Sequence, residues 1–205
     1  MKVLLEIIFI FILPVLLALF NIVRMKYRFH VFAVMILAGI MIVFSEHWSL
    51  LKLGMYVKQL SNGVVYYTAF TILAAAFIVF ISKFLKQQPV AKWWLHSHFL
   101  WGFIAISVTQ EFLYRSFLMP ELQTVFRSAL IVIILNTLIF TFIHLIYPNR
   151  LINLTMAFLG GLGIASLYFY FPNFYLVSLC HTILNFAVVY YRFFTFPDTF
   201  VFQKN

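Results

Sequence analysis

TQEFLYR, from Thr109 to Arg115, places a carboxylate and a guanidinium inside a run of sequence that is otherwise apolar enough for a membrane core. An ionisable side chain at the centre of a bilayer costs about 2.5–3.5 kcal/mol on insertion scales, so it requires a partner or a function. Glu111 and Arg115 are four residues apart, and the acid precedes the base, which is the favourable order for an ion pair on one helix face. The simplest interpretation is that they neutralise each other, which lets the helix insert and holds a bundle together.

The composition of the whole chain agrees with a membrane protein. The 205 residues are 65% hydrophobic and 9% charged, and they include 27 Phe, which leaves too few polar residues for a water-soluble surface. We therefore predict an all-α fold, a polytopic transmembrane bundle that forms a single domain over residues 1–205. The net charge of +9 comes from Lys and Arg in the loops, as membrane topology requires, so we expect a lipid bilayer and no nucleic acid as a partner.

The alternation of apolar runs and polar breaks predicts about seven spans. They cover residues 3–23, 30–44, 65–81, 96–119, 128–147, 151–171 and 174–191. Residues 45–63 are polar enough for a loop or a short surface helix. The MPEL stretch at 119–122 is expected to end the fourth span, because proline interrupts helices.

The loop charges predict how the bundle is oriented in the membrane. One side receives most of them: Arg24, Lys26, Arg28, Lys83, Lys86, Lys92, Arg150, Arg192 and Lys204. The other side receives Lys2, Lys52, Lys58 and Arg127. Because the basic side of a bundle is usually cytoplasmic, we expect the N-terminus outside and the C-terminus inside.

Two later spans carry polar residues at helical spacing. Phe140, His144 and Asn136 share a face of one span, and His181 and Asn185 share a face of another. A single histidine inside a membrane is often only hydrogen-bonded to a neighbouring helix. Two histidines and a carboxylate on three helices instead suggest a cluster that polarises a water for attack on a carbonyl, with the carboxylate as base and the imidazoles and amide as proton donors or oxyanion stabilisers.

The predicted spans do not bring these residues to one depth. A turn between the fourth and fifth spans near Arg127 would place Glu111 and His144 at the same depth in the membrane. His181 would further require a short or broken sixth span, for which Gly160, Gly161 and Gly163 offer a place. Ala157, Gly161 and Ala165 also form a smooth face for close helix packing. His30 lies near a loop, and we expect no catalytic role for it.

The motifs QEFLYR, FTFIH and HTILN resemble, in this order, the Glu-Glu-xxx-Arg, Phe-xxx-His and His-xxx-Asn motifs of the CPBP family of CAAX proteases and bacteriocin-processing enzymes. The resemblance implies an intramembrane peptidase in which Glu, two His and Asn line a cavity and hydrolyse a peptide bond near the membrane surface. The motif-bearing core would span residues 96–191. A chain this compact fits a bacterial member in the inner membrane that acts on a membrane-associated peptide or protein.

Carried over residue by residue, the resemblance predicts Glu111, His144, His181 and Asn185 as catalytic residues. Gln110, Arg115 and Phe140 are expected to support them. The chain departs from the motif at Gln110, which replaces the first glutamate, and an amide cannot act as a general base.

Three interpretations of Gln110 stay open: Glu111 has become the base, the chain is a natural inactive member, or Gln110 was introduced to trap a substrate. The alternative function is a non-catalytic membrane binding or self-immunity protein that keeps the protease scaffold. One carboxylate and two histidines are also able to ligate zinc. Because Gln110 replaces a carboxylate, we predict no cofactor.

Overall fold

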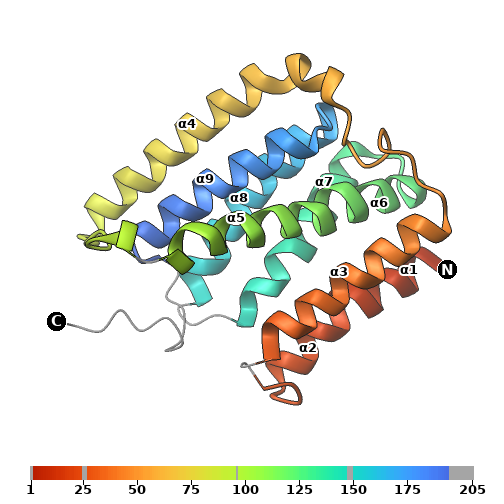
Figure 1. Cartoon of the computed structure of the whole chain (residues 1–205), viewed down its shortest axis with the longest axis horizontal. Helices are drawn as coiled ribbons and strands as arrows, with labels where there is room; N and C mark the ends of the chain where they lie inside the picture. The colour runs from red at the N-terminus through yellow and green to blue at the C-terminus, as the bar shows by residue number, and fades with distance from the viewer. Residues whose placement is uncertain (1, 25–26, 96, 147–149, 194–205) are drawn as a thin grey trace.

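The structure, a computed structural model, describes residues 2–24, 27–95, 97–146 and 150–193, and most of these residues are helical (Figure 1). In this part of the chain the helices form seven continuous segments and there is no strand, which confirms the predicted all-α fold. The first three segments are α1 (Lys2–Ile7), η1 (Ile8–Ile12) and α2 (Leu13–Leu19); α3 (Arg28–Ser45); and η3 (Val57–Gln59) with α4 (Leu60–Phe84). The others are α5 (Ser97–Glu111), η5 (Phe112–Leu118) and α6 (Met119–Val125), preceded by η4 (Trp93–Leu95); α7 (Ala129–Phe142) and η6 (Ile143–Ile146); α8 (Arg150–Tyr170); and α9 (Phe174–Tyr190).

Several of these segments have the length and composition of membrane spans. Among the described residues, four helices qualify by both measures: Lys2–Leu19, Leu60–Phe84, Ala129–Ile146 and Leu151–Tyr170. Two shorter apolar helices, His30–Ser45 and Phe174–Tyr190, accompany them. The protein is therefore an integral membrane protein built as a helical bundle.

The motif-bearing segment α5–η5–α6 runs through the middle of the bundle (Figure 1). It packs against α9 on one side, and η5 contacts α3 and α7. α4 lies along α9 at one edge of the bundle, and α1, α2 and α3 form the opposite edge (Figure 1). The charged motif is thus enclosed by more apolar helices.

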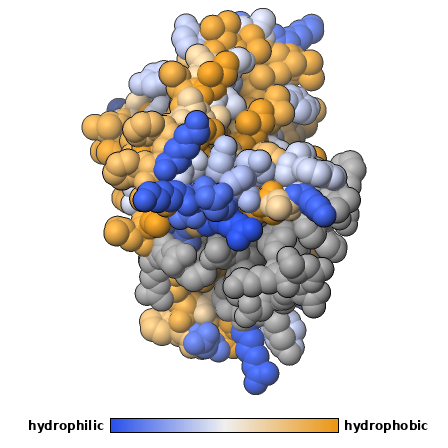
Figure 2. Space-filling model, turned by 90° about the vertical axis from the view of Figure 1, so that its left-hand side faces the viewer, coloured by the Kyte–Doolittle hydropathy of each residue, from blue (hydrophilic) through white to orange (hydrophobic). Residues whose placement is uncertain are grey.

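Contacts between loops show that successive helices alternate in direction. At one end of the bundle, the Phe174 amide donates to the Gly54 carbonyl at 2.9 Å, and the Tyr168 hydroxyl donates to the Leu53 carbonyl at 2.9 Å. At the other end, the Val90 amide donates to the Tyr190 carbonyl at 2.8 Å. This second end carries a group of hydrophilic side chains between hydrophobic flanks (Figure 2).

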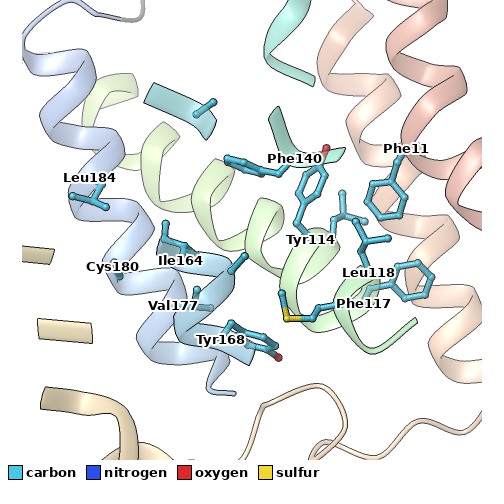
Figure 3. Packing of buried hydrophobic residues seen from close by; sticks show 14 of the residues in the cluster. Phe11, Tyr114, Phe117, Leu118, Phe140, Ile164, Tyr168, Val177, Cys180 and Leu184 are labelled. Carbon is cyan, nitrogen blue, oxygen red and sulfur yellow. The ribbon is translucent and has the colours of Figure 1, made fainter. Parts of the chain in front are cut away.

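Aromatic side chains connect the N-terminal helices to the motif helices (Figure 3). The ring of Phe11 lies 5.2 Å from that of Tyr114 and stacks on Phe117 at 6.3 Å. The ring of Tyr114 meets Phe140 edge-on at 5.2 Å. Residues 113–118 are all buried, so the π-helical η5 is the most enclosed part of the fold.

The prediction that MPEL ends the fourth span is wrong. The helix continues through Pro120, which lies in the first turn of α6 directly after the π-helical segment, where a missing N–H disturbs the hydrogen-bond ladder least. The helix ends at Phe126, whose backbone is extended, so the turn lies beside Arg127. This is the position expected to place Glu111 and His144 at the same depth in the membrane.

The expectation of a short or broken sixth span is also wrong, because α8 is continuous from Arg150 to Tyr170. Its glycines allow close packing instead: a Cβ on Gly161 would lie 2.9 Å from the Phe140 ring, and one on Gly163 would lie 2.3 Å from the Phe70 ring. The predicted span limits at residues 96 and 147 lie outside the described residues.

Candidate active site

Glu111, the last residue of α5, is fully buried and has two partners. Its Oε2 lies 3.5 Å from Nε of Arg115, one turn later in η5, and both side chains are 0% exposed. Its Oε1 is bonded to Nδ1 of His181. The ion pair expected from the sequence is therefore present, and a histidine from a distant part of the chain completes it.

Arg115 is held by groups on α7 and α8 as well as by Glu111. Its Nη2 donates to the Gly161 carbonyl at 3.3 Å, and its guanidinium carbon lies 4.8 Å from the centre of the Phe140 ring. The close approach of α8 depends on the absence of a side chain at Gly161. The small residues of α8 thus help to build the charged site.

His181 lies on α9, beside α5, and is 5% exposed. Since an ionised carboxylate only accepts hydrogen bonds, the Nδ1–H of His181 donates to Glu111, which leaves the basic lone pair of the neutral ring on Nε2. A carboxylate behind an imidazole fixes its tautomer and stabilises the imidazolium that forms when the ring takes a proton. Glu111 and His181 have this arrangement.

His144 lies in η6, directly after α7, and is 7% exposed. Its Nδ1–H donates to the Phe140 carbonyl at 3.1 Å, so the basic lone pair of this ring is also on Nε2. The Phe140 ring is 5.0 Å from the His144 ring and 5.6 Å from the His181 ring. Phe140 therefore contacts both histidines and Arg115.

Asn185 is on α9, one turn after His181, and its Nδ2 donates to the Ser107 hydroxyl at 3.0 Å. A primary amide has two N–H groups, so a second donor remains. Asn136, on the face of α7 that also carries Phe140, makes a different contact, because its Nδ2 donates to the Tyr114 carbonyl at 2.5 Å and ties α7 to η5. Asn136 is therefore a packing residue.

A cavity of about 280 Å³ brings part of the predicted set together. His144, His181 and Asn185 line it, whereas Gln110 and Glu111 are not among its described lining residues. Glu111 and Arg115 lie behind His181. The remaining walls are Phe140 of α7 and apolar residues of α4, α8 and α9. No signal in the sequence marks the residues of α4, because nothing distinguishes them from other membrane-facing residues.

The described residues contain no group of three or more His, Cys, Asp or Glu side chains placed to hold a metal ion. His144 and His181 both present Nε2, but Glu111 contacts the opposite nitrogen of His181. The prediction of a metal-free site remains to be tested by metal analysis.

Together, the membrane bundle and its enclosed Glu–His pair define an integral membrane protein with a buried polar site. Residues 92–187, just under half of the chain, match the family of type II CAAX prenyl endopeptidase Rce1-like proteins. This match confirms the resemblance to the CPBP proteases that the three motifs indicated. No curated protein and no solved structure matches the chain.

Proposed function

We propose that this protein is an intramembrane endopeptidase that hydrolyses a peptide bond of a membrane-associated protein or peptide. The observation that carries the proposal is the cavity shared by His144, His181 and Asn185, with the Glu111 carboxylate bonded to the far nitrogen of His181. The match of residues 92–187 to a family of CAAX prenyl endopeptidases supports the same class of reaction.

In this proposal, Nε2 of His181 takes a proton from a water as the water oxygen attacks the carbonyl carbon of the substrate. Glu111 is a positioning residue that stabilises the imidazolium formed. The second N–H of Asn185 donates to the developing oxyanion. The proton then passes from His181 to the amide nitrogen, the C–N bond breaks, and a carboxylic acid and an amine are released. His144 faces the same cavity and assists in binding the substrate carbonyl or the water.

This assignment of roles differs from the simplest carry-over of the family motif, in which the carboxylate itself is the base. Glu111 is 0% exposed, forms an ion pair with Arg115 and is hydrogen-bonded to His181. A base must reach the proton that it abstracts, directly or through one water, and the lining of the cavity favours His181 for that role.

The test is cleavage of quenched-fluorescence membrane peptides by the purified chain in proteoliposomes. We expect His181→Ala to abolish cleavage and His30→Ala, a change at an exposed histidine of α3, to retain it. Equal rates for the two variants would contradict the proposal. Metal analysis and addition of a chelator in the same assay test the prediction that no metal is required.

One observation favours a second function, which is peptide binding without hydrolysis. Gln110 occupies the first position of the motif, where the family has a glutamate. A wild-type protein that binds a membrane peptide at the cavity but cleaves none of the peptides tested would support this non-catalytic role, including a role in self-immunity.

We also propose that the basic end of the bundle lies in the cytoplasm of a bacterial cell and that the N-terminus lies outside. Lys83, in the last turn of α4, and Lys52, in the loop before it, are exposed at opposite ends. With a membrane-impermeant maleimide on intact spheroplasts, we expect Lys52→Cys to be labelled and Lys83→Cys to be protected. The reverse pattern would invert the topology.

A further inference from the structure

Two hydrogen bonds, one helical turn apart, join the motif helix to α9. Glu111 of α5 is bonded to His181 of α9. Four residues earlier on α5, the Ser107 hydroxyl oxygen accepts from Nδ2 of Asn185 at 3.0 Å. Because Asn185 lies four residues after His181, the two helices are antiparallel here and both bonds lie on the faces that they turn toward each other. Each polar end of the HTILN motif thus has its own partner on α5, which packs along α9 (Figure 1).

The bond of Ser107 differs from those of most hydroxyl groups in this bundle. Inside apolar helices a hydroxyl commonly donates back to a carbonyl of its own helix, as Ser166 and Thr182 do at 2.8 and 2.7 Å. The bond of Ser107 instead crosses to another helix. Ser107 is 0% exposed and does not line the cavity, whereas Asn185 is half-buried and does. The hydroxyl therefore lies behind Asn185, on the side away from the cavity.

We propose that Ser107 is a positioning residue: its oxygen holds one N–H of the Asn185 amide and thereby aims the other N–H into the cavity. The inference rests on the proposed peptidase function, in which this second N–H donates to the oxyanion. A side-chain amide is planar, so a bond to one N–H fixes the direction of the other. Without that bond, the terminal torsion of an asparagine is broadly distributed. Ser107 thus orients Asn185 as Glu111 orients His181.

The expected effect is smaller than the loss of the amide itself. Removal of an oxyanion donor lowers kcat by about 10²–10³-fold. Ser107→Ala keeps the donor and frees its rotation, so we expect kcat to fall about tenfold in the proteoliposome assay. KM should change by less than about twofold, because Ser107 does not reach the cavity. An unchanged kcat, or a loss that appears only in KM, would overturn the proposal.

Ser178 of α9 provides a matched control. It is also buried, at 6% exposure, and it does not line the cavity. Its hydroxyl has no hydrogen-bond partner among the described residues. Ser178→Ala removes the same atom from the helix that carries Asn185 and should leave kcat and KM unaltered. A tenfold fall in kcat for both serine variants would assign the effect to the loss of any buried hydroxyl and would overturn the proposal.

A double-mutant cycle separates positioning from packing. If Ser107 acts only through Asn185, its hydroxyl has no further effect once the amide is gone. The variant with both Ser107→Ala and Asn185→Ala should therefore have a kcat within about twofold of that of Asn185→Ala. A further tenfold loss in the double variant would show that Ser107 serves the packing of α5 on α9, and would overturn its role as a positioning residue.

A binding measurement makes the test independent of hydrolysis. Two uncleavable peptides of one sequence are compared: a phosphonamidate, whose anionic oxygen imitates the oxyanion, and a reduced amide, which has no oxygen at that position. We expect wild type to bind the phosphonamidate at least tenfold more tightly than the reduced amide. Ser107→Ala should weaken the phosphonamidate about tenfold and the reduced amide less than twofold, and Ser178→Ala should weaken neither. Equal weakening of both peptides by Ser107→Ala would overturn the proposal.

The measurements distinguish failure of Ser107 from failure of the function. A wild-type protein that prefers the phosphonamidate but cleaves no peptide would refute the peptidase, and loss of that preference in Ser107→Ala would still support the positioning role. Cleavage and preference that both survive Ser107→Ala would overturn the positioning role alone. A wild-type protein that lacks the preference would overturn the oxyanion role of Asn185 and, with it, the role of Ser107.

Discussion

Two ionic clusters in this protein have similar chemistry and opposite surroundings. Glu111 and Arg115 are both 0% exposed in the centre of the bundle, whereas Lys2 and Glu46, which are also bonded to each other, are 67% and 26% exposed at one end. Lys2 also lies 3.7 Å from Glu6, and the Trp48 indole donates to Glu46 at 2.8 Å. Exposed ion pairs contribute little to stability because water solvates both charges, whereas a buried charge that loses its partner has no substitute.

The bundle accommodates its charged helix by enclosing it among apolar helices. Most of α4 faces outward, because only 11% of its most hydrophobic stretch is buried inside the bundle. In contrast, residues 113–118 of the motif helix are all buried. The apolar helices separate the charges from lipid. Inside the bundle, the Glu111 carboxylate lies against a guanidinium and an imidazole, and the Arg115 guanidinium lies against that carboxylate and the Gly161 carbonyl. The polar site and the lipid-facing surface therefore belong to different helices.

The largest effect is expected from breaking the central pair. Arg115→Ala removes the partner of Glu111, the bond to the Gly161 carbonyl and the contact with Phe140, and should reduce stability by about 3–5 kcal/mol. The yield of folded protein and its thermal melting in detergent provide the measurement. Glu111→Gln should cost less, because an amide oxygen still accepts from His181 and because Arg115 keeps its contacts with the Gly161 carbonyl and the Phe140 ring. Melting of both variants at the wild-type temperature would show that the ion pair does not contribute to stability.

The next effect concerns catalysis by the same cluster. Glu111→Gln should lower kcat at least about 100-fold, because a neutral amide does not stabilise the His181 imidazolium, with KM changed much less. Glu46→Gln, the matched change in the exposed cluster, should leave both constants unaltered. A rise in KM at constant kcat would instead indicate that Glu111 serves substrate binding or packing.

The substitution Gln110→Glu tests which residue acts as the general base that activates water. Gln110 is 7% exposed and does not line the cavity, so restoring the family's glutamate should change kcat by less than about threefold if His181 is the base. Peptide cleavage by the purified variant is the measurement. A tenfold or greater increase would show that the first motif position is where water is activated and that the natural chain is impaired.

The smallest effect is expected at the exposed cluster. The bond from Lys2, and then that from Trp48, lowers the pKa of Glu46. The stabilisation from this carboxylate is therefore present above the usual pKa of glutamate and is lost as the pH falls through the lowered value. Lys2→Ala should lower the melting temperature by at most about 2 °C at neutral pH, and the difference should vanish in acid. A difference that grows with acidification would have the wrong sign for this mechanism.

The sequence by itself determined the class of the fold and proposed most members of the candidate site. Long apolar runs require helices in a bilayer, because every backbone N–H and C=O must be paired within the segment. Helical spacing alone put Glu111 with Arg115, His144 with Phe140, and His181 with Asn185, since residues four apart share a face. Each of these relations is local in the sequence, so it can be predicted without a structure.

Only the tertiary structure decided how the three motifs meet. Tilt, helix length and close packing at Gly161 bring His181 to Glu111 across 70 residues, let the motif helix continue past Pro120, and leave Glu111 behind the cavity. The same packing places α4, which carries no motif, in the wall of that cavity. These features depend on contacts between segments far apart in the chain, and apolar side chains that contact one another in the bundle look the same in sequence as those that contact lipid.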